Sequence, residues 1–239
     1  MIDNYFNPHV FALSNDFLVK KLSSTLGDIF LIENFYDNIN LVHEEIKKLP
    51  MTLIWDKDKR KEIYNKVLDC RKSYSSNMSG TELPFIKQLP SKIYRHLNLK
   101  EEQVYVPESL LINCSKKLEE YPENYYYNIH KDGLIWYDSI HQYAVIVFLN
   151  LDYTDKTTGF NIYRNSEKLS SNKMFIRHDE INLVHFIQAK SNMAVVIPKD
   201  VLHGAELGSN SQFCEDWRYT QVIFLPIFES CNKVNLTYN

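Results

Sequence analysis

Residues 125–132 read YYYNIHKD and end in a His-x-Asp pair, His130 and Asp132. On a β-strand, side chains two residues apart point to the same side, so this pair would place an imidazole beside a carboxylate. These are two of the three ligands of a 2-His-1-carboxylate triad, which holds non-haem Fe(II) and leaves coordination positions open. The best candidate for the second histidine is His203, within the sequence IPKDVLHGAELG.

The sequence around this stretch consists of short runs rich in Val, Ile, Tyr and Phe, separated by turn residues. Many short strands without intervening helices are typical of a β-sandwich or β-barrel. We expect strands at residues 125–130, 142–150, 159–164, 173–177, 182–187, 193–197, 201–203 and 218–225.

The first half of the chain is more mixed and predicts both helices and strands. We expect strands at residues 29–35 and 104–114, helices at residues 16–24, 39–48 (capped by Asp37) and 90–97 (with Pro90 first), a charged helix or loop at 57–66 and a polar loop at 73–81. No linker divides the chain. We therefore predict a single domain over 1–239, with an N-terminal helical and strand layer (1–120), a β core (121–226) and a C-terminal tail (227–239).

Composition argues against several classes of partner. The chain has 239 residues, a net charge of −3 and no basic surplus, so neither nucleic acid nor an anionic membrane is an expected partner. It contains no apolar run of about 18 residues and no N-terminal secretory signal, so we expect a cytoplasmic protein. The sequence does not indicate an oligomeric state.

The four cysteines are far apart and form no Cys-x-x-Cys pair: Cys70, Cys114, Cys214 and Cys231. We interpret them as reduced thiols rather than a zinc site. Neither a G-x-G-x-x-G motif nor a Walker A motif occurs, so no phosphate-binding loop is predicted.

Arg218, in the sequence WRYTQVIFL, begins the last expected strand. Alternation would place Thr220, Val222 and Phe224 on the same side as Arg218. A buried arginine needs an anionic partner, and its planar fork suits a carboxylate. The second half of the chain therefore offers a metal site and, beside it, a group that can bind a carboxylate.

In this order, the motifs resemble those of the Fe(II)/2-oxoglutarate-dependent dioxygenases, in particular the prolyl-4-hydroxylase-like branch. The resemblance covers about residues 121–226. It is carried by Tyr127, His130 and Asp132 as Tyr-x-x-His-x-Asp, the strand AVIVFLN at 144–150, Gly159 in TGFNIY, the distal His203, and Arg218 with Tyr219 before an apolar strand.

The resemblance implies a mainly β fold: a double-stranded β-helix (jelly-roll, cupin-like) core flanked by helices, with an N-terminal α/β layer. It implies that His130, Asp132 and His203 bind Fe(II) and that Arg218 binds the far carboxylate of 2-oxoglutarate. Such enzymes couple the conversion of 2-oxoglutarate and O₂ to succinate and CO₂ with oxidation of a substrate. Related halogenases replace the carboxylate ligand with a small residue, so Asp132 favours hydroxylation.

Two features depart from that branch. The segment between His203 and Arg218 is longer than usual, and Phe148 stands where a tyrosine often contacts 2-oxoglutarate. Phenylalanine cannot donate a hydrogen bond, so another donor is needed. Strand alternation makes Tyr126, Asn128 and Thr220 the candidates for this role in binding the co-substrate.

Two other His-x-Glu pairs compete with the proposed triad. His43 and Glu45 fall in an expected helix, where residues two apart do not face each other. His178 and Glu180 lie close to His203 in the sequence, which leaves a short segment to cross a barrel.

Other functions also remain open. A cupin-type metal enzyme without 2-oxoglutarate would not need Arg218, and a non-catalytic jelly-roll binding protein would not need a metal. For an oxygenase, we expect a small-molecule substrate such as an amino acid, with a peptide or protein side chain as the alternative.

Overall fold

The computed structural model describes residues 6–22, 26–53, 68–75, 83–117, 125–127, 129–132, 139–164, 175–177, 181–208 and 217–228. Its helical elements are η1 (Pro8–Phe11), α1 (Ile39–Ile46), α3 (Pro84–Ile93) and η2 (Glu101–Gln103). Its strands are β1 (Leu18–Leu22), β2 (Ile29–Glu33), β3 (Thr52–Leu53), β4 (Leu68–Ser75), β5 (Leu110–Lys117), β6 (Tyr125–Tyr127), β7 (Ser139–Phe148), β8 (Thr158–Tyr163), β9 (Phe175–Arg177), β10 (Leu183–Gln188), β11 (Met193–Pro198), β12 (Leu202–Leu207) and β13 (Arg218–Phe228).

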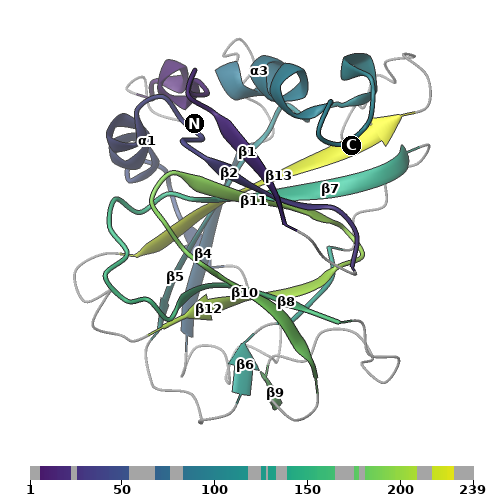
Figure 1. The fold of residues 1–239 in the computed structure, drawn as a ribbon. Helices are drawn as coiled ribbons and strands as arrows, with labels where there is room; N and C mark the ends of the chain where they lie inside the picture. Colours follow the sequence, from purple (N-terminus) through teal and green to yellow (C-terminus); the bar gives the residue numbers. More distant parts are fainter. Residues whose placement is uncertain are drawn as a thin grey trace.

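The strands form two facing antiparallel sheets (Figure 1). The larger sheet has the order β1-β2-β11-β7-β13-β5-β4-β3, and the smaller sheet has the order β10-β8-β12. His130 pairs with His203 in β12, so the segment 129–132 continues the smaller sheet at its β12 edge. A separate pair, β6 and β9, lies below the smaller sheet.

The order of these strands along the chain is that of a jelly-roll. The chain passes from β5 in the larger sheet to 129–132 in the smaller, then to β7 (larger), β8 and β10 (smaller), β11 (larger), β12 (smaller) and β13 (larger). Two four-stranded layers connected in this way form a double-stranded β-helix. The predicted fold class is therefore confirmed.

The central strands are apolar on both sides because the larger sheet is covered on both faces. In β7, Ile146 and Phe148 point into the space between the sheets and pack with the inner core. Their neighbours Val145 and Val147 point outward and pack beneath the helices. A strand buried on both faces loses the usual alternation of polar and apolar residues, which explains the run AVIVFL.

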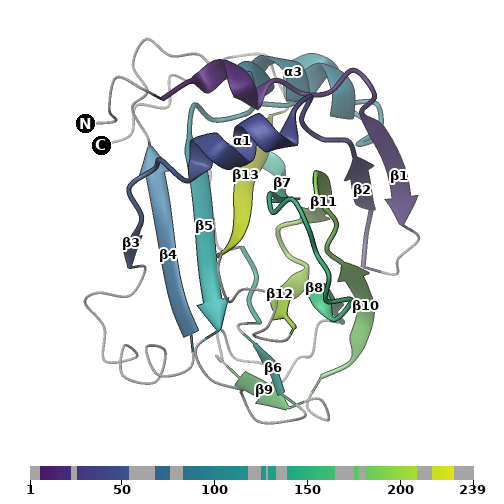
Figure 2. The same ribbon diagram turned by 90° about the vertical axis from the view of Figure 1, so that its left-hand side faces the viewer.

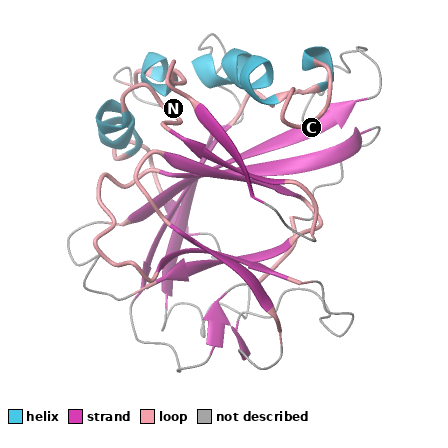
Figure 3. Ribbon diagram, viewed as in Figure 1, coloured by secondary structure: helices cyan, strands magenta, loops and turns pink. Residues whose placement is uncertain are grey.

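The helices lie on the outer face of the larger sheet and leave the space between the sheets to side chains from strands (Figure 3). The outer core includes Val42 of α1 and the α3 residues Phe85, Leu89 and Ile93, all fully buried. Within the described residues, no helix is long and apolar enough to span a membrane.

The first half of the chain supplies strands to the core as well as helices. Strands β1 to β5 all precede residue 121, and all join the larger sheet. Figure 2 shows β3, β4 and β5 at one side of this sheet and β1 and β2 at the other. In particular, β5 hydrogen-bonds to β13 and so belongs to the jelly-roll, although it lies before the expected core of 121–226.

Several expected boundaries in this half are wrong. Residues 18–22 form a strand, not a helix, because they pair along their full length with β2. Residues 73–75 belong to β4 rather than to a loop. The charged segment 57–66 lies outside the described residues.

Helix α1 begins at Ile39 as expected, but its cap residue differs, and α3 begins earlier than the helix expected at 90–97. Asn38, not Asp37, caps α1, because its side chain accepts a hydrogen bond from the Leu41 amide at 3.2 Å. The second helix begins at Pro84, so that Pro90 lies inside it. Burial of Phe85, one turn before Pro90, fixes this earlier start.

We predict that the packing of α3 on the larger sheet stabilises the whole fold. Phe85 is fully buried, and its ring packs edge-on against Tyr36 at a centroid distance of 6.5 Å. Phe85→Ala should lower the free energy of unfolding by about 3–5 kcal/mol, as measured by urea titration. Lys87→Ala, at an exposed position of the same helix, should change it by less than about 0.5 kcal/mol. Equal effects of the two substitutions would contradict this role for α3.

Candidate metal centre

Two backbone hydrogen bonds place the candidate histidines side by side. The His130 amide donates to the His203 carbonyl at 2.8 Å, and the His203 amide donates to the His130 carbonyl at 2.9 Å. Residues that exchange both bonds in an antiparallel pair lie directly opposite each other, with side chains on the same face. The two imidazole rings accordingly lie with their centroids 4.4 Å apart, between the sheets.

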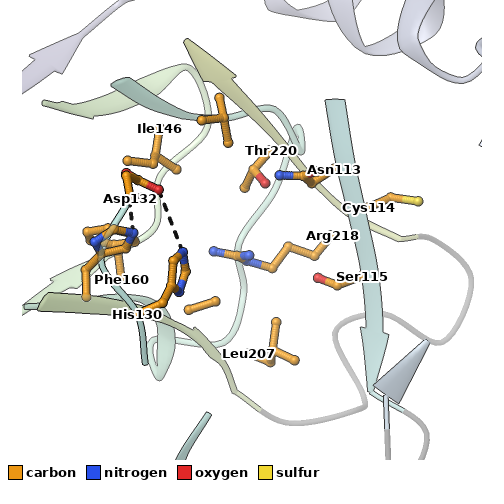
Figure 4. A pocket seen from close by; sticks show the side chains of 13 residues that line it. Asn113, Cys114, Ser115, His130, Asp132, Ile146, Phe160, Leu207, Arg218 and Thr220 are labelled. Atoms are coloured by element: carbon orange, nitrogen blue, oxygen red, sulfur yellow. Dashed lines mark ion pairs between the residues drawn. The ribbon is translucent and has the colours of Figure 1, made fainter. Parts of the chain in front are cut away.

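Asp132 completes a group of three. It lies two residues after His130, and its carboxylate points toward both rings (Figure 4). One carboxylate oxygen is 3.9 Å from Nε2 of His130, and the other is 3.8 Å from Nε2 of His203. One donor atom from each residue lies within 4.8 Å of the other two. Among the described residues, no other group of three histidine, cysteine or acidic side chains is arranged in this way.

The protonation of His203 is suited to binding a metal. Its Nδ1 lies 2.9 Å from the Val201 carbonyl, which can only accept, so Nδ1 carries the proton and Nε2 presents a lone pair. Burial, together with the nearby His130, lowers the pKa of His203 to about 3. His203 is therefore neutral at physiological pH, as a metal ligand must be.

Asp132 is also placed where a cation would be favourable. Burial raises the pKa of its carboxyl group, and the charge of His130 partly offsets this effect. A metal ion between the three side chains would compensate the buried carboxylate, since metal–ligand bonds are about 2 Å long and the donor atoms already converge. Two imidazoles and one carboxylate are the donor set of a non-haem Fe(II) site, so the residues present fit this metal.

The triad opens into a cavity of about 160 Å³ between the sheets. Its apolar lining includes Ile146 from the larger sheet and Phe160 and Leu207 from the smaller sheet. The ring of Phe160 stacks on His203, with centroids 5.2 Å apart and an interplanar angle of 26°. Phe160 thus packs on the ring of His203, and the Nδ1 hydrogen bond to the Val201 carbonyl leaves Nε2 facing Asp132.

Arg218 enters the same cavity from β13 (Figure 4). It is only 4% exposed, and its Nη2 donates to the Gly159 carbonyl at 3.2 Å. Thr220, two residues later, also lines the cavity, as strand alternation predicts. A buried guanidinium and the candidate metal-binding triad therefore line one cavity.

Two further polar residues line this cavity, Asn113 and Ser115, which were not among the residues expected from the sequence. They lie on β5, where Ser115 is opposite Arg218 and Asn113 is opposite Thr220. The sequence LLINCSKK contains a signal for them, because Asn113 and Ser115 alternate with the buried Ile112 and Cys114. That alternation indicates a strand with one polar and one apolar side. Only the pairing of β5 with β13 shows that the polar side faces the cavity.

Only some of the site residues expected from the sequence can be placed at the cavity. His130, Asp132, His203, Arg218 and Thr220 come together. Of the other candidates for binding 2-oxoglutarate, Tyr126 belongs to β6 and pairs with Ile176, but its side chain lies outside the described residues, as does the whole of Asn128. The competing pair His178 and Glu180 also falls outside the described residues.

The other competing pair, His43 and Glu45, has structural partners on α1. Nδ1 of His43 lies 2.9 Å from the Leu149 carbonyl, beneath the helix. Glu45 accepts hydrogen bonds from the Asn7 amide at 2.6 Å and from Lys48 at 2.8 Å. The His43 contact joins α1 to the segment that follows β7, and the Glu45 contacts lie within the helical layer; none of these partners lines the cavity.

Comparison with known proteins gave matches among solved structures alone: no family model and no curated protein matches the chain. A prolyl-4-hydroxylase from Pseudomonas putida is similar at 11% identity, over 80% of this chain and 88% of that chain, with a TM-score of 0.43. A 2OG-Fe(II) oxygenase family oxidoreductase from Burkholderia pseudomallei is similar at 9% identity, over 88% and 72%, with a TM-score of 0.34. The epimerase SnoN, solved with Fe³⁺ and alpha ketoglutarate, is similar at 8% identity, over 93% and 76%, with a TM-score of 0.37. At such low identities and TM-scores, the function of this chain has to be inferred from its own side chains.

Proposed function

We propose that this protein is a non-haem Fe(II)/2-oxoglutarate-dependent dioxygenase that hydroxylates an unactivated C–H bond. The observation that carries the proposal is one cavity that contains both the His130–Asp132–His203 triad and the buried Arg218 guanidinium. A metal site alone would serve many reactions. A buried arginine directed toward that site adds a specific requirement for an anionic ligand.

His130, Asp132 and His203 would hold the iron through one atom each. Bound in this way, Fe(II) supplies the activation of O₂ and of the substrate C–H bond, which no amino-acid side chain can provide. The protein holds the three donors on the edge of one sheet and surrounds them with apolar side chains. Among these, Phe160 packs on the ring of His203, while the Nδ1 hydrogen bond to the Val201 carbonyl keeps the Nε2 lone pair directed at the metal position.

2-Oxoglutarate matches the two polar ends of the cavity. Its 2-oxo acid end suits a metal with open coordination positions, and its far carboxylate suits the fork of Arg218. Thr220 and Asn113, opposite each other on β13 and β5, can donate further hydrogen bonds to that carboxylate. Of the hydrogen-bond donors expected from strand alternation, Thr220 is retained in this role. Asn113 is a further donor that the cavity lining adds.

Asp132 bears on the outcome of the reaction. A carboxylate occupies the third protein position, so halide cannot take that position on the metal. This supports hydroxylation over halogenation. For the substrate, we propose a small molecule such as an amino acid. A peptide or protein side chain that presents only its reacting group is the alternative.

We predict that Asp132 is required for metal binding. In Asp132→Asn, loss of one ligand charge should weaken Mn(II) or anaerobic Fe(II) binding by about 100-fold or more, measured by calorimetry, and should abolish the rise in Tm that metal gives the native protein. Asp152→Asn removes an exposed carboxylate and should leave both unchanged. Wild-type metal affinity in Asp132→Asn, or a native protein that binds no metal, would contradict the proposed site and would favour a non-catalytic jelly-roll.

We predict that Arg218 is required for binding 2-oxoglutarate but not metal. Under anaerobic conditions, addition of 2-oxoglutarate to the Fe(II)-loaded protein should produce a metal-to-ligand charge-transfer band in the visible range. In Arg218→Leu, the Kd obtained from this band should rise by about 30-fold or more, because the carboxylate loses its charged partner. Metal affinity should remain unchanged.

Arg164→Leu, at an exposed arginine, is the matched control and should bind 2-oxoglutarate normally. If the native protein gives no band with 2-oxoglutarate but still binds metal, a cupin-type metal enzyme that uses no 2-oxoglutarate becomes the better description.

A further inference from the structure

The guanidinium of Arg218 is held from two directions by groups that belong to different strands. Its Nη2 donates to the carbonyl of Gly159 in β8, at 3.2 Å. Its central carbon lies 5.8 Å from the ring centroid of Phe148 in β7, within the distance of a cation–π contact. The side chain thus starts in the larger sheet and is fixed at its far end against the smaller one.

Phe148 is itself held in place. It is fully buried, and Tyr153 packs edge-on against it, with centroids 6.1 Å apart and an interplanar angle of 74°. The Tyr153 hydroxyl is bonded to Asn150, and burial raises the pKa of Tyr153 to about 12, so this residue stays neutral beside the cation. The Phe148 ring therefore contacts the guanidinium of Arg218, and Tyr153 packs edge-on against Phe148 and holds that ring in place.

Gly159 is fixed by close packing from β10. A Cβ atom at this position would lie 2.3 Å from the Ile187 carbonyl oxygen and 2.7 Å from the ring of Phe186. Real side chains do not approach so closely, so a larger residue would displace β8 from β10. The absence of a side chain thus lets the two strands pack tightly and sets where the Gly159 carbonyl meets Arg218.

Such support matters because a free arginine side chain samples many rotamers. An arginine side chain has several rotatable bonds, and one that is already ordered before binding loses less conformational entropy when the ligand arrives. Phe148 cannot donate a hydrogen bond to a carboxylate, but its ring face can hold the cation that does. Phe148 thus lacks the hydrogen bond that a tyrosine could give to 2-oxoglutarate, but its ring contacts the guanidinium of Arg218.

We propose that Phe148 and Gly159 are positioning residues that preorganise Arg218, and that this sets the preference of the site for a dicarboxylic over a monocarboxylic 2-oxo acid. The inference rests on the proposed function and deepens it. It concerns only the end of the cavity away from the metal. Loss of the support should weaken the grip on the far carboxylate and leave the metal and the 2-oxo acid end unaffected.

The test compares two ligands of equal chain length: 2-oxoglutarate, and 2-oxopentanoate, which lacks the far carboxylate. Their Kd values are measured by calorimetry on Mn(II)-loaded native protein, Phe148→Leu and Phe148→Tyr. In Phe148→Leu, which keeps an apolar side chain without a ring face, the Kd for 2-oxoglutarate should rise about tenfold. The Kd for 2-oxopentanoate and for Mn(II) should stay within about twofold of the native values. Phe148→Tyr keeps the ring and should retain native affinity for 2-oxoglutarate.

Phe224→Leu is the matched control, because Phe224 packs against the same inner core on the strand that carries Arg218. It should not change the ratio of the two Kd values. If the ratio of the Kd values for 2-oxoglutarate and 2-oxopentanoate stays unchanged in Phe148→Leu, whether both affinities are retained or both fall equally, the positioning role is overturned. If the native protein itself does not prefer 2-oxoglutarate over 2-oxopentanoate, it is the proposed function that fails.

Discussion

The site depends on one pair of backbone hydrogen bonds, between His130 and His203. This pair joins the segment 129–132 to β12 and sets the register between two parts of the chain that are far apart in sequence. A slip of one residue would turn every side chain of the segment to the other face of the sheet. Both His130 and Asp132 would then leave the cavity. The geometry of the triad is therefore encoded in strand pairing more than in contacts between the three side chains.

The cavity is unusual within an otherwise apolar core. Between the two sheets, Phe148, Phe160 and Val195 pack tightly, whereas the neighbouring space contains a buried carboxylate and a buried guanidinium. Burying charges is unfavourable unless they are compensated. The outer core compensates at the level of the whole fold, because the helices bury many apolar side chains on the far face of the larger sheet. The fold can thus keep a polar interior that a ligand and a metal would complete.

Much of the second half could be predicted because its information is local. The strands alternate or run apolar over a few residues, and the order of His130, Asp132, His203 and Arg218 follows the order of the strands. The first half was less predictable because its strands are defined by their pairing with other strands rather than by their own apolar pattern. LVKKL at 18–22 is too polar to indicate a buried strand, and it becomes one by pairing with β2. Asn113 and Ser115 were missed for the same reason, since only the pairing of β5 with β13 brings them to the cavity.

The two ends of the cavity are built by different means, and this has consequences for how each can change. The metal end rests on main-chain hydrogen bonds, which do not depend on the identity of neighbouring side chains. The arginine end rests on packing, since Phe148 and the close approach of β10 to Gly159 fix the guanidinium. A change of one or two methylene groups in this packing can move a side chain without unfolding the protein. Under the proposed function, selectivity for the 2-oxo acid is therefore easier to alter through the core than the metal site itself.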